Sequence, residues 1–375
     1  MAKLLKRSPH YGMHLKNNPK GLFDFAGWEM PTHFSSLEEE VRACREAAIL
    51  FDGHAMGEFH IKGREALRAV QKLCANDLGK AQRGNLVYTS MCTESGGIFD
   101  DLVVFCLGPQ HYLLTVAAFN VDKASAWIEK HIAGMDAYLC NQSAGTTCIE
   151  VQGPESRAIL QKVAQFDVSN AALPYYRFVE GKVGEVDCLV GRLGVTGELG
   201  YEIFYDAGHA WYMYELLQEA GKGHGLQLCG NRTIGIMRLE KVYHIYNREI
   251  DEATNPFEAG LGRAVKLEKG DFVGRDALRK IKERGNSRKL VGLIAEPGTK
   301  VAAPKTPVSA SGHEVGYITA MANSPTLNKP IALAYVQLDA SEVGTQLTVG
   351  NGSDSIKMTV TTIPFYDPNG TRLRN

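Results

Sequence analysis

The sequence predicts an α+β protein in which a mixed region is followed by a small all-β domain. Between residues 36 and 242, strand and helix patterns are mixed with antiparallel hairpins, whereas a doubly wound parallel sheet needs a crossover helix between successive strands. Residues 290–375 are nearly all short strand candidates separated by Gly, Pro and Asn, which indicates a small β-barrel or sandwich. The basic stretch 274–289 is typical of a solvated helix face that runs into a linker. We therefore expect two domains, over residues 1–285 and 286–375.

The first half of the mixed region begins with a marked helix start. Ser36-Leu37-Glu38-Glu39 is a capping box, and the apolar residues after it predict a helix that continues through Ile49. Further strands are expected near 56–62, 86–92, 101–107 and 111–117. Helices are expected over 64–74 and 121–132, because apolar residues recur there with helical spacing.

The second half has a similar pattern between residues 146 and 242. Strands are expected near 146–152, 176–180, 186–192 and 200–205. Helices are expected near 154–164, 208–220 and 231–242, and Pro154 occupies the favoured opening turn of the first of them. The two halves together predict two intertwined α+β lobes.

Composition and charge exclude several classes of function. With 44% hydrophobic and 22% charged residues, the 375-residue chain has an ordinary globular composition. A net charge of -1 offers no general attraction to nucleic acid or to a membrane surface. No signal peptide or membrane span is apparent, and the eight cysteines have no CxxC spacing. We expect a soluble cytoplasmic protein with reduced thiols and no metal site.

Common catalytic motifs are absent, since no nucleotide-binding, zinc-protease or serine-hydrolase signature occurs. One unusual stretch, GRLGVTGELG, has a glycine at every third position from Gly191 to Gly200. It predicts a tight double turn between two strands. Alternatively, its small residues let a flat ligand approach the backbone, with Glu202 just beyond to hold it.

Two adjacent carboxylates, Asp100 and Asp101, follow a glycine turn at the start of an apolar strand. An aspartate beside a turn often only caps backbone NH groups. However, neighbouring strand residues point to opposite faces, so one of this pair should look inward. An inward carboxylate must be hydrogen-bonded, ion-paired or reserved for a ligand.

Six segments together identify a family resemblance: FAGWEMP at 25–31, FDGHAMGEF at 51–59, GGIFDDLVV at 96–104, VTGELGYEIF at 195–204, TNPFEAGLGRAVKL at 254–267 and SPTLNKPIALAYV at 324–336. The chain resembles the aminomethyltransferase family, the T-protein of glycine cleavage with its relatives the tetrahydrofolate-dependent demethylases. The resemblance implies a three-lobed cloverleaf around a tetrahydrofolate cavity, with a β-barrel as the third lobe. Residues 1–285 would then be the folate-binding catalytic region.

The resemblance also implies site residues. Asp101 would be the catalytic carboxylate facing the folate, and Asp100 the outward, turn-stabilising one. Glu202 would pair with the amino-pyrimidine edge of the pterin and Arg232 with the glutamyl carboxylates. The folate-site positions as a set are Tyr88, Val195, Glu202, Arg232 and Tyr243. His33 and His54 are candidates on the side of the one-carbon donor.

Four positions depart from the family pattern by losing a polar group. They are Ala55, Ala117, Val195 and Ile363. From these losses we predict a changed donor, and so a demethylase that moves a methyl group from a small N-, O- or S-methylated substrate to N5 of tetrahydrofolate. The alternative is an aminomethyltransferase of glycine cleavage, with a lipoyl carrier protein as its partner. A third possibility is a folate-binding regulatory protein without transferase activity.

Overall fold

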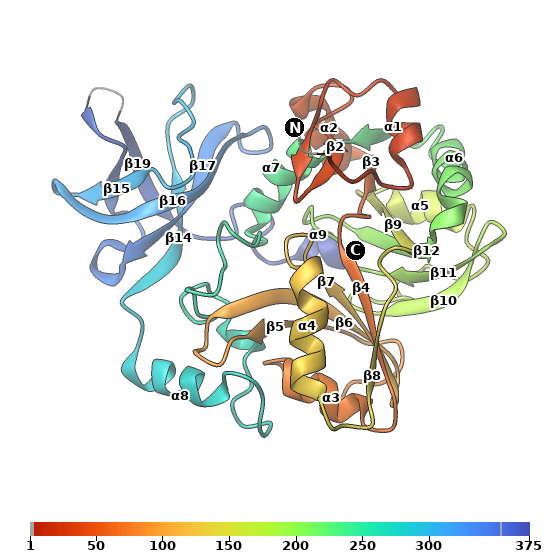
Figure 1. Cartoon of the computed structure of the whole chain (residues 1–375). Helices are drawn as coiled ribbons and strands as arrows, with labels where there is room; N and C mark the ends of the chain where they lie inside the picture. The colour runs from red at the N-terminus through yellow and green to blue at the C-terminus, as the bar shows by residue number, and fades with distance from the viewer. Residues whose placement is uncertain (1–3, 353–354) are drawn as a thin grey trace.

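The computed structural model describes residues 4–352 and 355–375 and contains two open sheets and a closed barrel. The six-stranded sheet has the order β10-β11-β12-β9-β3-β13, and the five-stranded sheet has the order β5-β6-β7-β4-β8. The barrel closes in the order β14-β17-β16-β15-β18-β19, and β1-β2 form a separate hairpin. The barrel stands at one side and the two open sheets pack at the other (Figure 1). The predicted α+β fold class with a C-terminal barrel is confirmed.

The first lobe is built around the five-stranded sheet, although three strands of its chain segment, β1, β2 and β3, do not join that sheet. Its elements are α1 (Tyr11–Lys16), β1 (Leu22–Phe25), β2 (Trp28–Pro31), α2 (Leu37–Glu46), β3 (Ala48–Asp52), β4 (Gly57–Lys62), α3 (Ala66–Leu73), β5 (Leu86–Cys92), β6 (Ile98–Gly108), β7 (His111–Val116), α4 (Val121–Ile132) and β8 (Tyr138–Asn141). The predicted capping box is present, because Ser36 and Glu39 exchange both side-chain bonds.

The second lobe contributes most of the six-stranded sheet. Its elements are β9 (Thr146–Gln152), α5 (Ser156–Gln161), β10 (Phe178–Val183), β11 (Val186–Gly191), β12 (Gly200–Asp206), η1 (Ala207–His209), α6 (Ala210–Ala220), β13 (Leu226–Cys229) and α7 (Asn231–Lys241). β3 lies between β9 and β13 in this sheet, so a strand of the first chain segment crosses into the second lobe. The two lobes are therefore intertwined.

The barrel lobe follows a connecting helix. Its elements are η2 (Gly262–Ala264), α8 (Arg275–Arg284), β14 (Arg288–Ile294), β15 (Pro307–Ala310), β16 (His313–Ser324), β17 (Lys329–Gln337), η3 (Leu338–Ala340), β18 (Gln346–Val349), β19 (Ile356–Thr361) and α9 (Thr371–Arg374). The basic stretch falls on α8, whose side chains are mostly exposed. The domain boundary after residue 285 stays a prediction.

The helix expected through Ile49 ends earlier. Helix α2 stops at Glu46, and the next residues form β3, in which every residue is buried. A strand that is covered on both faces is apolar at successive positions, so its start cannot be separated from an apolar helix end by periodicity. The sequence prediction of helix was therefore wrong for residues 47–49.

The two open sheets meet face to face through aromatic residues. Phe105 of β6 lies 5.3 Å from Phe178 and 5.4 Å from Phe204, measured between ring centroids, and all three side chains are buried. Each sheet also has a separate apolar core on its helix-covered face. Both faces of each sheet are therefore covered, and polar side chains between the sheets lie in the interior.

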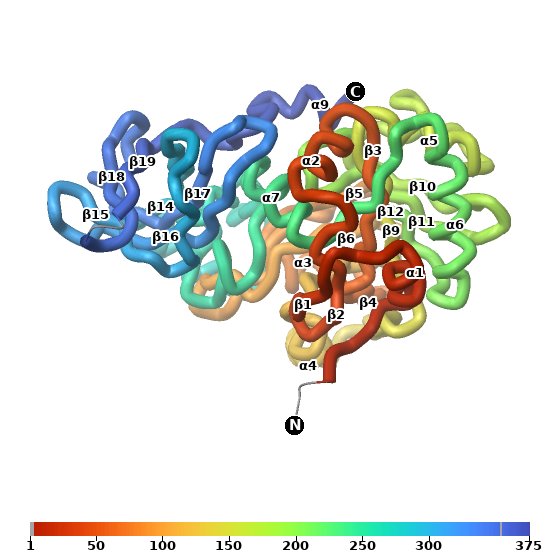
Figure 2. Tube along the Cα trace, turned by 90° about the horizontal axis from the view of Figure 1, so that it is seen from above, coloured from red at the N-terminus to blue at the C-terminus, as the bar shows by residue number. Residues whose placement is uncertain are grey.

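A buried ion network joins the three lobes. Arg45 of α2 donates to Glu198 at 3.0 Å and to Glu240 of α7 at 2.5 Å. Glu240 also accepts from Ser324 of the barrel, and Glu198 accepts from Arg372 near the C-terminus at 2.8 Å. Helix α7 lies between the barrel and the two sheets (Figure 2). The network therefore fixes the position of α7 relative to both neighbours.

Replacing Glu240 with alanine should destabilise the protein strongly. The substitution leaves the buried Arg45 guanidinium without one of its two carboxylates, and losing one partner of a buried pair costs about 3–5 kcal/mol. Chemical denaturation measures the loss. Glu219→Ala, which removes an exposed carboxylate on α6, is the control and should change stability by less than about 0.5 kcal/mol. Equal effects of the two substitutions would contradict the stabilising role of the network.

Candidate functional site

Two adjoining cavities lie where the lobes meet. The larger has a volume of about 710 Å³ and the smaller about 200 Å³. Both are lined by Met56, Asp101, Ala117, Val195, Tyr243 and His244. The larger cavity also reaches Glu202 on the six-stranded sheet and Ile363 after the barrel. Its walls therefore come from all three lobes.

Asp101 of β6 stands at the boundary of the two cavities. The Tyr88 hydroxyl on the neighbouring strand β5 donates to Asp101 Oδ2 at 2.8 Å, which fixes the carboxyl. Burial raises the pKa of Asp101, while the nearby His244 and the hydrogen bond from Tyr88 act in the opposite direction. A fixed carboxyl with a raised pKa at a cavity wall is suited to proton exchange with a ligand.

Asp100 does not point outward as predicted. Its side chain is fully buried, and its Oδ2 accepts a hydrogen bond from the Ala117 backbone at 3.1 Å. Burial raises its pKa well above the usual range, with the charge of Asp101 as a further cause. The chain leading into α4 covers this face of the sheet, so alternation places both members of the pair in the interior. Asp101 faces the cavities, and Asp100 faces the chain segment that leads into α4.

Glu202 of β12 and Glu150 of β9 are directly opposite each other across two antiparallel strands. Burial raises the pKa of Glu202 to about 8. Burial and the charge of Glu202 raise the pKa of Glu150 well above its usual range. Glu202 lines the larger cavity as predicted, whereas Glu150 lines the smaller one and was not predicted. Alternating polar residues in an interior strand were the available signal for Glu150.

The four departures from the family pattern all lie on the cavity walls. Ala117 and Val195 line both cavities, Ala55 lines the smaller and Ile363 the larger. These positions were expected near the folate or the one-carbon donor, and the structure places them where a bound ligand would contact them. The walls at these points are apolar.

Three predicted residues lie outside both cavities. Arg232 is exposed, with its guanidinium 5.6 Å from the Phe23 ring centroid. Helix α7 presents Asn231, Ile234, Gly235 and Arg238 to the smaller cavity, and position 232 falls on a different face of the helix. His54 is buried with its ring edge-to-face against Trp28, and His33 lies in the segment between β2 and α2. Their assigned roles stay predictions that this arrangement does not support.

The turn after α7 carries two cavity residues, of which His244 was not predicted. Val242 has φ = 62°, a left-handed conformation that is costly for a β-branched residue. Arg238 holds the turn by donating to the Tyr243 carbonyl at 3.1 Å and to the Glu249 carboxylate at 2.6 Å. Tyr243 and His244 are thereby directed into the space between the lobes.

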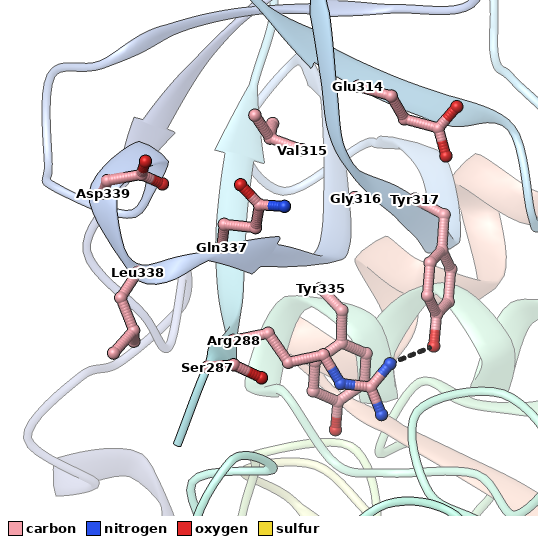
Figure 3. Close-up of a pocket in the computed structure, with 10 residues that line it drawn as sticks. All are labelled: Ser287, Arg288, Glu314, Val315, Gly316, Tyr317, Tyr335, Gln337, Leu338 and Asp339. Carbon is pink, nitrogen blue, oxygen red and sulfur yellow. Dashed lines mark hydrogen bonds between the residues drawn. The ribbon is translucent and has the colours of Figure 1, made fainter. Parts of the chain in front are cut away.

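A third cavity, of about 650 Å³, lies on the barrel away from these residues. Arg288 is its most prominent polar side chain, and it bonds to the Tyr317 hydroxyl at 3.1 Å (Figure 3). The same guanidinium donates to Glu258 at 3.0 Å and lies 4.6 Å from the Tyr335 ring centroid. Its charge is already paired within the protein, and no predicted site residue lines this cavity. The pair of cavities around Asp101 is therefore the candidate site.

Membrane and metal features add nothing to the candidate site. In the part of the chain that the structure describes, none of the helices has the length and apolar character needed to span a bilayer. The same residues include no group of three or more His, Cys, Asp or Glu side chains placed to hold a metal ion. Carboxylates, tyrosines and a histidine are among the side chains that line the two cavities.

Comparison with known proteins covers nearly the whole chain. Residues 11–269 match a family model described as the GCVT N-terminal domain, and residues 288–367 match the glycine cleavage T-protein C-terminal barrel domain. The chain is 40% identical over 363 residues to the aminomethyltransferase of Moorella thermoacetica, covering 96% of this chain and 98% of the relative. It is 42% identical over 372 residues to the aminomethyltransferase of Symbiobacterium thermophilum, covering 98% of each.

A solved structure shows the same fold. The crystal structure of glycine cleavage system aminomethyltransferase T from Bartonella henselae aligns with a TM-score of 0.89 at 26% sequence identity. The alignment covers 97% of this chain and 99% of that one. The similarity therefore extends over both sheet lobes and the barrel.

Stability should fall as the pH rises toward 8. The folded chain keeps a proton on Glu202 up to about pH 8, whereas the unfolded chain releases it near pH 4.5, so the free energy of unfolding decreases between these values. Between about pH 6.5 and 8, this group alone contributes a slope of about 1 kcal/mol per pH unit. Denaturation of the Glu202→Gln protein should show a slope reduced by this amount. The exposed Glu180→Gln substitution should leave the slope unchanged, and an unchanged slope in Glu202→Gln would contradict the assignment.

Proposed function

The chain belongs to the family of glycine cleavage T-proteins, the aminomethyltransferases, and is a one-carbon transferase enzyme; from this premise we propose that it is an aminomethyltransferase of glycine cleavage. Its donor is an aminomethyl group carried by a lipoyl carrier protein, and its acceptor is tetrahydrofolate. The methylene carbon passes to the two folate nitrogens, its bond to the amine breaks to release ammonia, and its bond to sulfur breaks to leave the carrier as a dihydrolipoyl thiol. The observation that carries the proposal is the position of the Asp101 carboxyl, which Tyr88 holds by a hydrogen bond at the boundary of the two cavities.

The predicted demethylase is wrong. Relatives that match over 96% or more of this chain at about 40% identity carry the name aminomethyltransferase, as does the solved structure that shares its fold. A small methylated substrate therefore has no support. The four apolar replacements line the cavities, but Tyr88, Asp101 and Glu202 are all present at the site. Loss of polar groups from a wall alters packing and solvation and does not by itself define the donor.

The residues around the larger cavity fit a folate. A volume of about 710 Å³ is within the usual range for a cofactor of this size. Glu202 offers a buried carboxyl in the cavity, which suits a ligand edge that carries NH donors. Tyr88, Tyr176 and Tyr243 supply aromatic surface for a flat ring system. When bound, tetrahydrofolate supplies the nitrogen that accepts the one-carbon unit.

Asp101 has the position that proton transfer requires. Its carboxyl lines both cavities, so one group can accept a proton from a ligand on one side and donate it to a ligand on the other. Tyr88 limits the rotation of the carboxyl, and His244 lies close enough to influence its charge. Apolar walls at Ala117 and Val195 restrict water near this carboxyl, which strengthens its electrostatic effect.

We also propose that the protein acts in the cytoplasm. All eight cysteines are free in the structure, and seven of them are buried. Buried free thiols suit a compartment in which cysteines remain reduced. The lipoyl carrier would then be a protein of the same compartment.

Incubating the enzyme with tetrahydrofolate and an aminomethyl-lipoyl carrier should give 5,10-methylenetetrahydrofolate and ammonia, detected by mass spectrometry and an ammonia assay. Asp101→Asn should lower kcat/KM by about a hundred- to ten-thousand-fold, because a positioned acid-base group contributes this much. Asp187→Asn, which changes an exposed carboxylate on β11, is the matched control and should retain full activity. Absence of product from the unmodified enzyme would overturn the proposed function.

Tyr88→Phe should shift the pH dependence of the reaction. The Tyr88 hydrogen bond favours the charged form of Asp101, so its removal raises the pKa of that carboxyl further. The acidic limb of the kcat/KM profile should therefore move to higher pH, with folate affinity little changed. An unshifted profile would show that Asp101 does not act as the base.

A further inference from the structure

The Glu150 carboxyl lies in the smaller cavity, in space that is left open because residue 53 is a glycine. A Cβ atom at Gly53 would lie 2.8 Å from Glu150 Oε1 and 3.3 Å from the sulfur of Cys148. Gly53 does not have a left-handed backbone, so the glycine is explained by space and not by conformation. Both residues line the cavity, and the Glu150 side chain is almost completely buried. The pair Gly53 and Glu150 therefore forms one built feature of the wall.

Within the part of the chain that the structure describes, this carboxyl has no cationic partner. The Gln152 amide donates a hydrogen bond to Glu150 Oε2, and among residues 4–352 and 355–375 no Lys, Arg or His forms an ion pair with Glu150. Its nearest ionisable neighbours on adjacent strands are Glu202 and Asp52, which are also acids. A buried carboxyl in this setting is costly as an anion and is stabilised by a cation from outside.

The rest of the cavity selects the kind of cation. Its volume of about 200 Å³ admits only a few non-hydrogen atoms, and most of its wall is apolar. Phe25, Phe51 and Phe119 line it, and aromatic rings both tolerate thioether carbon and sulfur and attract ammonium groups. Arg238 also lines the cavity, but its guanidinium is committed to Glu249. A primary ammonium on a short thioether chain matches these features.

We propose that Glu150 binds the ammonium group of the aminomethyl donor in the smaller cavity, beside Asp101. This inference rests on the proposed function and assigns the two cavities separate ligands, the donor tip to the smaller and the folate to the larger. Glu150 acts in binding and orientation, since it holds the amine at the wall that Asp101 shares. The carbon attached to that amine then lies toward the boundary between the cavities.

Binding of the ammonium group should release a proton from Glu150. Burial and the neighbouring Glu202 raise the pKa of Glu150 well above its usual range, so the empty cavity favours the protonated carboxyl. An incoming ammonium favours the carboxylate, and the proton leaves to solvent. The other ionisable groups that line this cavity are Asp52, Asp101, Arg238, Tyr243, His244 and Tyr246, and Glu202 lies opposite Glu150 on the neighbouring strand. Amine binding should therefore tighten as the pH rises toward the pKa of Glu150.

A binding experiment tests this without turnover. The probe is 2-(methylthio)ethylamine, a stable thioether with a primary amine, and its uncharged comparison compound is methyl propyl sulfide. Titration calorimetry of the whole protein in buffers of different ionisation enthalpy measures both affinity and proton release. We expect saturable binding of the amine with release of about one proton, and at least about tenfold weaker binding with no proton release in Glu150→Gln.

Two further variants separate binding from folding. Gly53→Ala should displace the Glu150 carboxyl and weaken amine binding, and combining it with Glu150→Gln should add little, because both act on one contact. Glu185→Gln, an exposed substitution of the same kind, should bind as the unmodified protein does. Circular dichroism and thermal denaturation confirm that each variant is folded.

The outcomes distinguish this inference from the proposed function. Equal amine affinity in Glu150→Gln and the unmodified protein, or binding of methyl propyl sulfide as tight as that of the amine, would overturn the role of Glu150. In the transfer assay, Glu150→Gln should raise KM for the aminomethyl carrier by at least about tenfold while KM for tetrahydrofolate stays unchanged. Failure of the unmodified enzyme to transfer the aminomethyl carbon would instead overturn the function, whatever the amine titration shows.

Discussion

The site depends on the buried contacts of Arg45. This guanidinium binds carboxylates from the loop before β12 and from α7, and those carboxylates in turn bind the barrel and the C-terminal segment. Helix α7 lines both cavities or leads into the turn that does, and the C-terminal segment contributes Ile363 to the larger one. A buried guanidinium with two carboxylates is stable in only one arrangement, because any displacement leaves a desolvated charge unpaired. The relative position of the lobes, and with it the shape of the cavities, follows from that constraint.

Between the two sheets, the protein buries more carboxyl groups than it neutralises. Glu150 and Glu202 face each other across two strands, and Asp101 lies on the opposite sheet. Asp52 is the exception, since contacts with His10 and His14 hold its pKa below the usual range despite burial. Burial raises the pKa values of Asp101, Glu150 and Glu202, and such groups can exchange protons with ligands. The free-energy cost of burying these carboxyl groups is therefore concentrated at the two cavities, where the proposed donor and acceptor bind next to each other.

Sequence reasoning located part of this site and missed part of it. Tyr88, Asp101, Val195, Glu202 and Tyr243 line the cavities, as the family pattern suggested. His244 was missed because nothing in its local sequence distinguishes an interior polar residue from a surface one, and Glu150 because alternation along β9 does not show that both faces of the strand are covered. Arg232 lies outside both cavities, on a different face of α7 from the residues that line the smaller one, and its folate-binding role stays a prediction. The demethylase prediction was wrong because four apolar replacements on the cavity walls were taken as evidence of a changed donor.

The sequence by itself determined the local elements and their class. The capping box at Ser36, the glycine turn before Asp100 and the hairpin-rich order of strands depend on contacts between near neighbours in the chain, which sequence patterns record. Only the tertiary structure decided which side chains share a cavity. Crossing of β3 into the second sheet, closure of the barrel and packing of the two sheets through Phe105 all join residues far apart in the chain. Their burial, and therefore their pKa values and chemistry, is set by partners that no local pattern contains.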